Sequence, residues 1–242
     1  ALGFLVPAGQ LAVWALTVAD TSFDAAFWNL VLHSLGLAAV AALLALALAL
    51  VMGYGRRLLP TRMVNSAVRI AGMGYAVPGT VIAVGVIIPF AWIENSLDAW
   101  MRARFGLSTG LWLSGTLIAL LFAYLVRFLA VSLQTVESGL GKIKPAMDES
   151  ARSMGMRPGE VLRRIHMPML RGSLLTALLL VFVDVLKEVP ATLILRPFNF
   201  NTLAVRVYEL AADERLADAA PAALAIVLAG LLPVILLSRS IT

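Results

Sequence analysis

Three ionisable residues interrupt a long apolar run in the C-terminal third of the chain. Asp184, Lys187 and Glu188 lie within SLLTALLLVFVDVLKEVPATLIL, where Pro190 follows them. Asp184 and Lys187 are three residues apart, so they can pair along one face of a helix. Charged side chains are costly inside a membrane-crossing segment, and they mark a functional position there by default. Their meaning therefore depends on whether this run crosses a membrane.

Composition indicates an integral membrane protein. The 242 residues are 61% hydrophobic and 14% charged, and the mean hydropathy is +0.92. Soluble domains are about 45–50% apolar and about 25% charged. There are no cysteines, which excludes disulfides and cysteine-ligated metal centres. His33 and His166 are far apart in sequence, so we expect no metal site. In a membrane protein the net charge of +5 bears on membrane orientation rather than on nucleic acid.

Six stretches are long and apolar enough to cross a membrane, which takes about 20 residues each. They predict an all-α, polytopic helical bundle, with spans at residues 2–19, 28–53, 70–93, 110–133, 173–195 and 219–238. The third span contains several glycines and prolines, among them Pro78 and Gly79. Such residues allow close packing and kinks. The sharper interpretation is a hinge or a segment lining a path at Pro78–Gly79.

The charges of the connecting loops alternate along the chain. Loop 54–69 holds four arginines and no acid, and loop 134–172 holds seven basic and four acidic residues. Loop 20–27 is acidic, loop 94–109 is mixed, and loop 196–218 has more acids than bases. Because basic residues are retained in the cytoplasm, this pattern predicts that both termini are cytoplasmic.

With this topology, Asp184 is expected near mid-depth in the fifth span. A structural position near the outer interface is the alternative for the cluster of Asp184, Lys187, Glu188 and Pro190. A proton relay is a further alternative, but only Arg127 is otherwise available inside a span. We favour a packed, paired position beside a translocation path that also includes Pro78 and Gly79.

Sequence motifs of known enzymes are absent. There is no GxxxxGK[ST] phosphate loop, no HExxH, no GxSxG and no glycine-rich dinucleotide fingerprint. We therefore expect no catalytic residues, no bound cofactor and no ATPase activity in this chain.

The longest polar stretch, DESARSMGMRPGEVLRRIHMP at residues 148–168, lies in loop 134–172. Pro145 favours a helix start, and Gly155 suits the left-handed position that ends a helix. Pro158 suits the first turn of a second helix, which Pro168 is expected to end. The pattern predicts two short helices joined at Gly155 on the cytoplasmic face. Contact with anionic lipid and contact with a protein are equally compatible with this charge pattern.

The spacing within this stretch resembles the EAA motif of ABC importer permeases. Glu149, Ala151, Gly155, Ile165 and Pro168 occupy the motif positions, while Ser150 and Met167 replace an alanine and a leucine. The resemblance implies a MetI-like, type I permease whose loop, at about 134–172, docks into a separate ATP-hydrolysing subunit. ATP would then be used by that partner and not by this chain.

A narrower resemblance points to ferric-iron transporter permeases. It covers GYAVPGTVIAVGV at residues 74–86, residues 184–216 and the following ALAIVLAGLLPVILLSR. It implies that residues 1–242 form one transmembrane permease domain, the C-terminal half of a longer fused permease, in a bacterial inner membrane. The implied partners are ABC ATPase subunits, a periplasmic binding protein, a second permease half and the lipid bilayer, without nucleic acid. Polyamine, sulfate, thiamine and aminophosphonate permeases share the general pattern.

Two other functions fit part of the sequence. A secondary transporter would use Asp184, Lys187 and Glu188 as ion-coupling residues, but it has no need of the loop at 134–172. A membrane scaffold would use that loop for docking alone.

Overall fold

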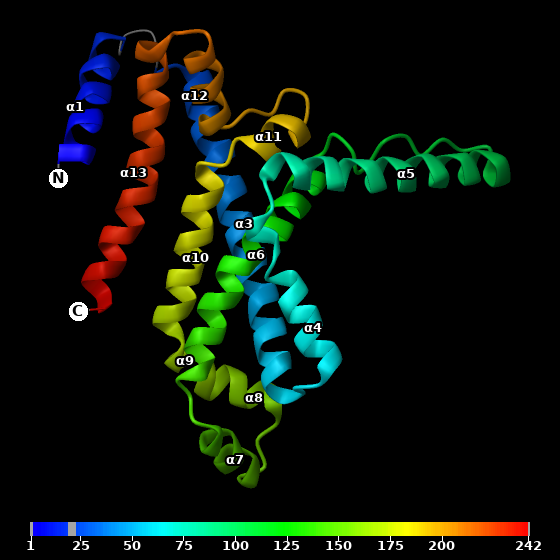
Figure 1. Ribbon diagram of the computed structural model, residues 1–242. Coiled ribbons are helices and arrows are strands. Elements are labelled where there is room, and N and C mark those ends of the chain that lie inside the picture. The colour runs from blue at the N-terminus through cyan, green and yellow to red at the C-terminus, as the bar shows by residue number, and fades with distance from the viewer. Residues whose placement is uncertain (1, 19–22, 242) are drawn as a thin grey trace.

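The computed structural model describes residues 2–18 and 23–241, and within these residues it contains helices and no β-strand (Figure 1). Ala19 and Asp20, which the sequence places in the first span and the first loop, lie outside the described residues, as do residues 1 and 242 and the side chain of Arg239. In chain order the elements are α1 (Leu2–Thr17), α3 (Ala25–Leu58), α4 (Arg62–Ala71), η1 (Gly74–Ala76), α5 (Gly79–Phe105), α6 (Leu117–Gly141), α7 (Pro145–Ser153), α8 (Pro158–Val161), a π-helical turn η2 (Leu162–His166), α9 (Met167–Met169), α10 (Arg171–Leu186), α11 (Pro190–Leu195), α12 (Leu203–Ala212) and α13 (Leu216–Ile241). The predicted all-α membrane bundle is confirmed.

Three helices, α3, α6 and α10, pack against one another and form the centre of the bundle (Figure 1). The face of α3 that they cover consists of small residues, including Ala38, Ala41 and Ala45, each at most 1% exposed. Small side chains let helix backbones approach closely, which is how membrane helices gain packing contacts. On the outside of α3, Leu43, Leu48 and Val51 are exposed. This distribution suits a helix with protein on one side and lipid on the other.

The termini of the central helices carry polar caps. Asp24 precedes α3, and its side chain accepts a hydrogen bond from the N–H of Phe27 at 2.8 Å. Thr116 does the same for α6 through the N–H of Ile118. Each cap satisfies one of the backbone donors that a helix start leaves free. The sequence therefore marks where both helices begin.

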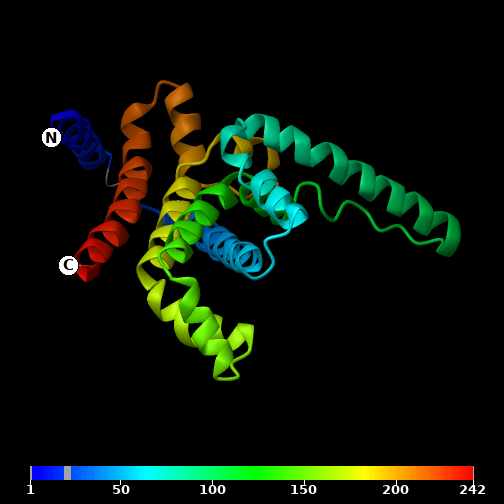
Figure 2. The same cartoon turned by 60° about the horizontal axis from the view of Figure 1, so that its bottom comes forward.

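Helix α5 lies across the axis of the central bundle and projects away from it (Figures 1 and 2). The segment after α5 runs back beside it, held by two acids of the helix. The buried Glu94 accepts hydrogen bonds from the N–H groups of Leu113 and Ser114, and Asp98 accepts one from that of Thr109. The third and fourth predicted spans had wrong boundaries, because the chain breaks at residues 72–78 and helix resumes only at residue 117. Gly106, at φ 68°, ends α5 in the left-handed conformation that glycine adopts without strain.

Fewer helices are long and apolar enough to cross a membrane than the six predicted spans. Among the described residues, four helices are long and apolar enough, namely α3, α5, α6 and α13, and the bent pair of Pro158–Met169 and Arg171–Leu186 can supply a fifth. α1 has only 16 residues. The predicted fifth span, 173–195, was wrong as one helix, because α10 ends at Leu186 and α11 starts at Pro190. Pro190 lacks the N–H that would continue α10, and it occupies the first turn of α11, where a proline is tolerated.

Helices α1, α12 and α13 form one side of the molecule. α1 and α12 both pack against α13, while α12 also contacts α3 (Figure 1). Phe27 of α3, Leu203 of α12 and Ala222 of α13 form a small buried cluster at the end opposite α7. The free ends of α1 and α13 both point toward the end of the bundle that carries α7 and α8 (Figure 1).

Two glycines provide a sharp test of this packing. A Cβ atom on Gly74 would lie 1.7 Å from the carbonyl oxygen of Val126, whereas one on Gly85 would meet nothing within 4 Å. We expect Gly74→Ala to destabilise the protein by about 3 kcal/mol or more, because a backbone must move. Gly85→Ala should be neutral or stabilising by up to about 1 kcal/mol, since alanine favours helix. Thermal unfolding of the two purified variants checks this, and equal melting temperatures would contradict the η1–α6 contact.

Candidate functional site

The first of the two predicted polar helices is α7, whose start and end follow from its sequence. Pro145 occupies its first turn and Asp148 lies near its N-terminus. At the other end, Gly155 has φ 81°. The N–H of Gly155 donates to the carbonyl of Arg152 at 2.9 Å, and that of Met156 donates to the carbonyl of Ala151 at 3.1 Å. This pair of hydrogen bonds is the Schellman motif. The prediction that Gly155 ends the helix in the left-handed conformation is therefore confirmed.

The second polar helix begins where predicted, at Pro158, where the side chain of Glu160 accepts a hydrogen bond from the N–H of Arg157 at 2.9 Å. It then widens into the π turn η2 and continues through α9 to Met169, before α10 leaves at an angle of 79°. The predicted end at Pro168 is therefore confirmed to within one residue.

The polar loop itself is shorter than the predicted 134–172. Helix α6 continues to Gly141, because no proline interrupts it before that position, and α10 resumes at Arg171. We call residues 142–170 the docking loop. It lies at one end of the bundle (Figure 1).

The five motif residues of the docking loop occupy two different environments. Glu149, Gly155 and Pro168 are exposed, Ala151 is fully buried, and Ile165 is half-buried. Ile165 also lines a shallow apolar depression together with Met147 and Met154. The loop therefore presents an acid and an apolar depression outward, while Ala151 packs inward.

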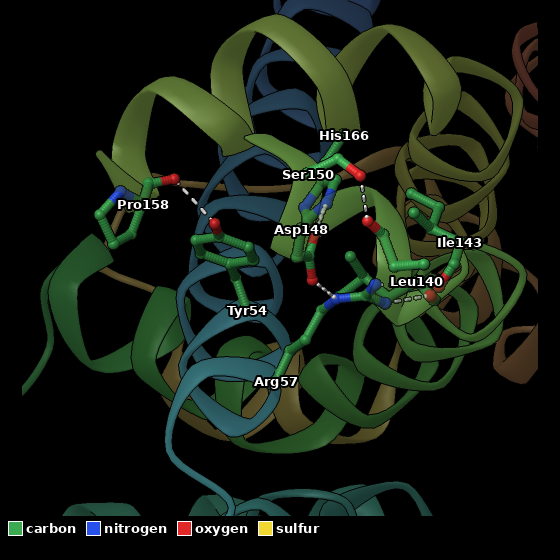
Figure 3. A network of polar contacts seen from close by, with 9 residues as sticks. Tyr54, Arg57, Leu140, Ile143, Asp148, Ser150, Pro158 and His166 are labelled. Carbon is green, nitrogen blue, oxygen red and sulfur yellow. Dashed lines mark hydrogen bonds and ion pairs between the residues drawn. The ribbon is translucent and has the colours of Figure 1, made fainter. Parts of the chain in front are cut away.

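The inward side of the docking loop is held by a polar network, drawn in Figure 3. Arg57, in the last turn of α3, donates from Nε to Oδ2 of Asp148 at 2.7 Å. Nε2 of His166 lies 2.6 Å from Oδ1 of the same carboxylate, and the His166 side chain is fully buried. Since a carboxylate only accepts, Nε2 carries the proton and donates it. Tyr54, one turn before Arg57, donates to the carbonyl of Pro158 at 2.7 Å.

The charge of Asp148 is stabilised by this network. Burial raises the pKa of the Asp148 carboxyl, but the hydrogen bonds and positive charges of Arg57 and His166 outweigh burial and hold the pKa below its usual value. A depressed pKa contributes stability above the ordinary aspartate range, and that stability is lost as the pH falls through the folded-state pKa. The network is therefore intact at neutral pH.

A second cluster lies inside the bundle, where α5, α6 and α11 meet. Nη1 of Arg127 lies 3.8 Å from Oε1 of Glu188, whose side chain is 2% exposed. The Glu188 carboxylate also accepts hydrogen bonds from the N–H groups of Ala191 and Thr192, both at 3.0 Å, at the start of α11. A Cβ atom on Gly79 would approach Arg127, Glu188 and Pro190. The structure thus brings together Gly79, Glu188 and Pro190, which the sequence had grouped as path candidates.

The other predicted path residues lie one turn away. Lys187 and Asp184 form the predicted pair, with Nζ 2.9 Å from Oδ1, and the hydroxyl of Tyr75 donates to Asp184 at 3.4 Å. Asp184, which was expected near mid-depth of a single helix over residues 173–195, lies in the last turn of α10. The Lys187 side chain is 63% exposed. Pro78 precedes α5 and is exposed.

Sequence reasoning did not select several residues that complete these clusters. Arg57 and His166 hold the docking loop, while Arg127 and Thr192 surround Glu188. Arg127 had a detectable signal, since it is the one charged residue in the predicted span 110–133. His166 and Arg57 had none beyond their charge, because their hydrogen-bond partners are up to 91 positions away in sequence.

A helical bundle with several membrane-spanning helices, a two-helix polar loop at one end and ion pairs between its helices defines the class of multi-pass membrane transport subunits. The chain belongs to the family of binding-protein-dependent transport system inner membrane components, which matches residues 45–242. It is thus an ABC transporter permease subunit, and permeases of this kind are not enzymes themselves.

Two curated relatives show the range of the family. The chain is 28% identical over 165 residues to the Fe(3+)-transport system permease protein FbpB 2 of Haemophilus influenzae, covering 68% of this chain and 29% of that one. It is 26% identical over 164 residues to PhnV of Salmonella typhimurium, whose name assigns it to 2-aminoethylphosphonate transport, with 68% and 56% coverage. The matched region therefore spans roughly half or less of the length of either relative.

Solved structures share the fold. A bacterial ABC transporter that imports the acidic polysaccharide alginate superposes with a TM-score of 0.75 at 14% identity, covering 94% of this chain and 82% of that one. The methionine ABC transporter MetNI, in an inward-facing conformation, gives a TM-score of 0.63 at 18% identity, covering 89% and 96%.

Glu188 and its neighbour Lys187 should respond differently to substitution. Glu188→Ala leaves Arg127 inside the bundle without its partner and leaves the N–H groups of Ala191 and Thr192 unpaired, a change that typically costs about 3 kcal/mol or more. Lys187→Ala removes only a pair whose lysine is mostly exposed, and such pairs contribute at most about 1 kcal/mol. We expect the amount of folded protein in membranes to fall several-fold for Glu188→Ala alone. Similar loss in both variants would contradict the assigned burial.

Proposed function

We propose that this chain forms one half of the translocation path of an ATP-driven, binding-protein-dependent importer. The observation that carries the proposal is the docking loop, a helix, glycine turn and helix at one end of a membrane bundle. Its exposed Glu149 makes no hydrogen bond or ion pair to the described residues. A secondary transporter has no use for such a surface.

The partner at the docking loop is an ABC ATPase subunit on the cytoplasmic side. Glu149 and the apolar depression at Met147, Met154 and Ile165 supply a charged and a hydrophobic contact. Apolar anchors with a polar rim are the usual makeup of a protein interface. The chain binds no cofactor, and ATP is used by the partner.

A second permease half completes the path. Within the part of the chain that the structure describes, α5 packs closely against α6 and α11, and large apolar side chains on its other faces, including Ile88, Trp92 and Trp100, are exposed. A single half with a projecting helix does not enclose a path through a membrane. A periplasmic binding protein delivers the cargo to the end opposite the docking loop. One of the similar solved structures is an alginate transporter in complex with its substrate-bound periplasmic protein.

Ferric iron is the proposed cargo, on the strength of the FbpB relative and the sequence resemblance described above. 2-Aminoethylphosphonate is the alternative that the PhnV relative supports. Polyamines, sulfate and thiamine are further alternatives from the general sequence pattern. In this class, cargo selection rests largely on the binding protein.

We propose that the chain lies in a bacterial inner membrane with both termini in the cytoplasm. The free ends of α1 and α13 point toward the docking-loop end (Figure 1). Arg56, Arg57 and Arg62 lie at or just beyond the end of α3, near the docking loop, where basic residues indicate the cytoplasmic side.

Uptake into proteoliposomes tests the function. The full permease is reconstituted with its ATPase subunits and loaded with binding protein and either ⁵⁵Fe(III) or radiolabelled 2-aminoethylphosphonate. We expect ATP-dependent accumulation of ⁵⁵Fe(III). Accumulation of the phosphonate alone would overturn the iron assignment, and accumulation driven by an ion gradient without ATP would overturn the class of transporter.

A further inference from the structure

Asp148 and Glu149 are adjacent acids in the docking loop, yet they face opposite ways. Glu149 is exposed, whereas the Asp148 side chain is 15% exposed and lies between Arg57 and His166 (Figure 3). The EAA motif includes Glu149 but not Asp148. The motif therefore does not account for the inward-facing acid beside the docking residue.

Arg57 is the centre of the contacts around Asp148. Its Nη1 donates to the carbonyl of Leu140 at 2.6 Å, and its Nη2 donates to the carbonyl of Ile143 at 2.9 Å. Its Nε donates to Asp148. One planar guanidinium therefore joins α3 to the last turn of α6, to the linker after it and to α7. Charge-assisted bonds of this fork geometry are among the strongest that a side chain makes.

Helix α7 depends on this attachment. Its closest backbone neighbour is α8, and its backbone approaches α3 and α6 only sparsely. α8 is in turn held by the hydrogen bond from Tyr54 to Pro158. Tyr54 and Arg57 are three residues apart, so they lie on one face of α3. A single turn of α3 thus holds both short helices.

The N-terminal end of α3 contacts α12, at the end of the molecule opposite the docking loop. The hydroxyl of Ser34 accepts a hydrogen bond from the N–H of Leu203 at 2.8 Å, which fixes the start of α12. Phe27 packs beside Leu203. Between these ends, α3 is one uninterrupted helix of 34 residues without an internal proline, a length of about 50 Å. α5 and α13 contain internal prolines, and α10 is followed by a break.

We propose that Arg57 and Asp148 are positioning residues that join the docking loop to α3, and that α3 carries a displacement of the loop to α12 at the opposite end. This inference rests on the proposed function, because it assumes that a partner moves the docking loop. His166 supports the pair by holding the second oxygen of Asp148. Glu149 contacts the partner, and Asp148 transmits the displacement of the docking loop to Arg57 and α3.

The experiment measures cargo transported per ATP hydrolysed, with the full permease, its ATPase subunits and the loaded binding protein in proteoliposomes. The probes are ⁵⁵Fe(III) and 2-aminoethylphosphonate, and the ratio is taken with whichever the unmodified complex accumulates. We expect Asp148→Asn to lower the ratio by about tenfold, a typical size for coupling between contacting residues. ATP hydrolysis should fall much less. Arg69→Gln, which neutralises an exposed residue of α4 outside the docking loop, should leave the ratio unchanged.

A double-variant comparison separates positioning from simple stability. Arg57→Lys keeps the charge but loses the fork, and the double variant Arg57→Lys with Asp148→Asn should lose no more coupling than the worse single variant. A loss equal to the sum of the two would overturn the inference. So would a drop in assembled complex with an unchanged ratio, because Asp148 would then be merely structural. Absence of ATP-driven uptake of both probes by the unmodified complex would instead contradict the proposed function.

Discussion

Glu149→Arg is expected to abolish ATP-driven uptake while the protein still inserts and folds. The Glu149 side chain is exposed and makes no hydrogen bond or ion pair to the described residues, so its removal disturbs nothing within this chain. Reversing a charge at a docking surface juxtaposes like charges, which costs several kcal/mol. We expect uptake to fall by about 100-fold or more, measured in proteoliposomes with the partner ATPase present.

The control for this substitution is Arg69→Glu. Arg69 is also exposed and changes by the same two charges, but it lies in the last turn of α4, outside the docking loop. It should retain uptake within about twofold, as surface substitutions commonly do. Copurification of the ATPase subunits gives a second readout and should be lost for Glu149→Arg alone. Wild-type uptake by Glu149→Arg would remove the docking loop from the mechanism.

Gly155→Pro is expected to eliminate uptake by a different route. Gly155 has φ 81°, whereas a proline ring holds φ near −65°. Proline also lacks the N–H that Gly155 donates to Arg152. The turn between α7 and α8 cannot form, so Glu149 and the apolar depression lose their relative positions. We expect uptake below about 1% of the unmodified level, because the cost exceeds about 3 kcal/mol.

Two other substitutions of Gly155 should reduce uptake by smaller amounts than proline does. Gly155→Asn should retain most uptake, because asparagine tolerates the left-handed conformation. Gly155→Ala should lie between, at a cost of about 1–2 kcal/mol. Gly159→Ala is the matched control, since Gly159 has no positive φ and nothing lies within 4 Å of its Cβ position. If Gly155→Pro transports normally, the helix–turn–helix geometry is not required for coupling.

Local chemistry accounts for the parts of the docking loop that were predicted correctly. Pro145, Gly155 and Pro158 specify a helix start, a left-handed turn and a second helix start through their own backbone preferences. These preferences do not depend on the rest of the chain. The structure confirms all three. The second helix ends at Met169, one residue after the proline that was expected to end it.

The membrane spans were correctly predicted to be helical, but their boundaries were predicted less well. Hydropathy identifies apolar segments, but it does not show where a helix breaks inside one. Residues 72–78 and 187–189 lie within apolar runs, and yet they separate helices. At the second break, Glu188 turns its carboxylate onto the start of α11 and toward Arg127. That arrangement requires a residue 61 positions away, which no local pattern contains.

The sequence by itself determined the class of protein, the all-helical membrane architecture and the location of the docking loop. These follow from composition, hydropathy and short-range spacing, each of which acts within a few turns of the chain. Only the tertiary structure decided which acids serve which purpose. Asp148 and Glu149 are neighbours of the same charge, and they differ because Arg57, at the end of α3, reaches one of them and not the other. Long-range packing places that guanidinium, so the division between an outward docking acid and an inward holding acid exists only in the folded chain.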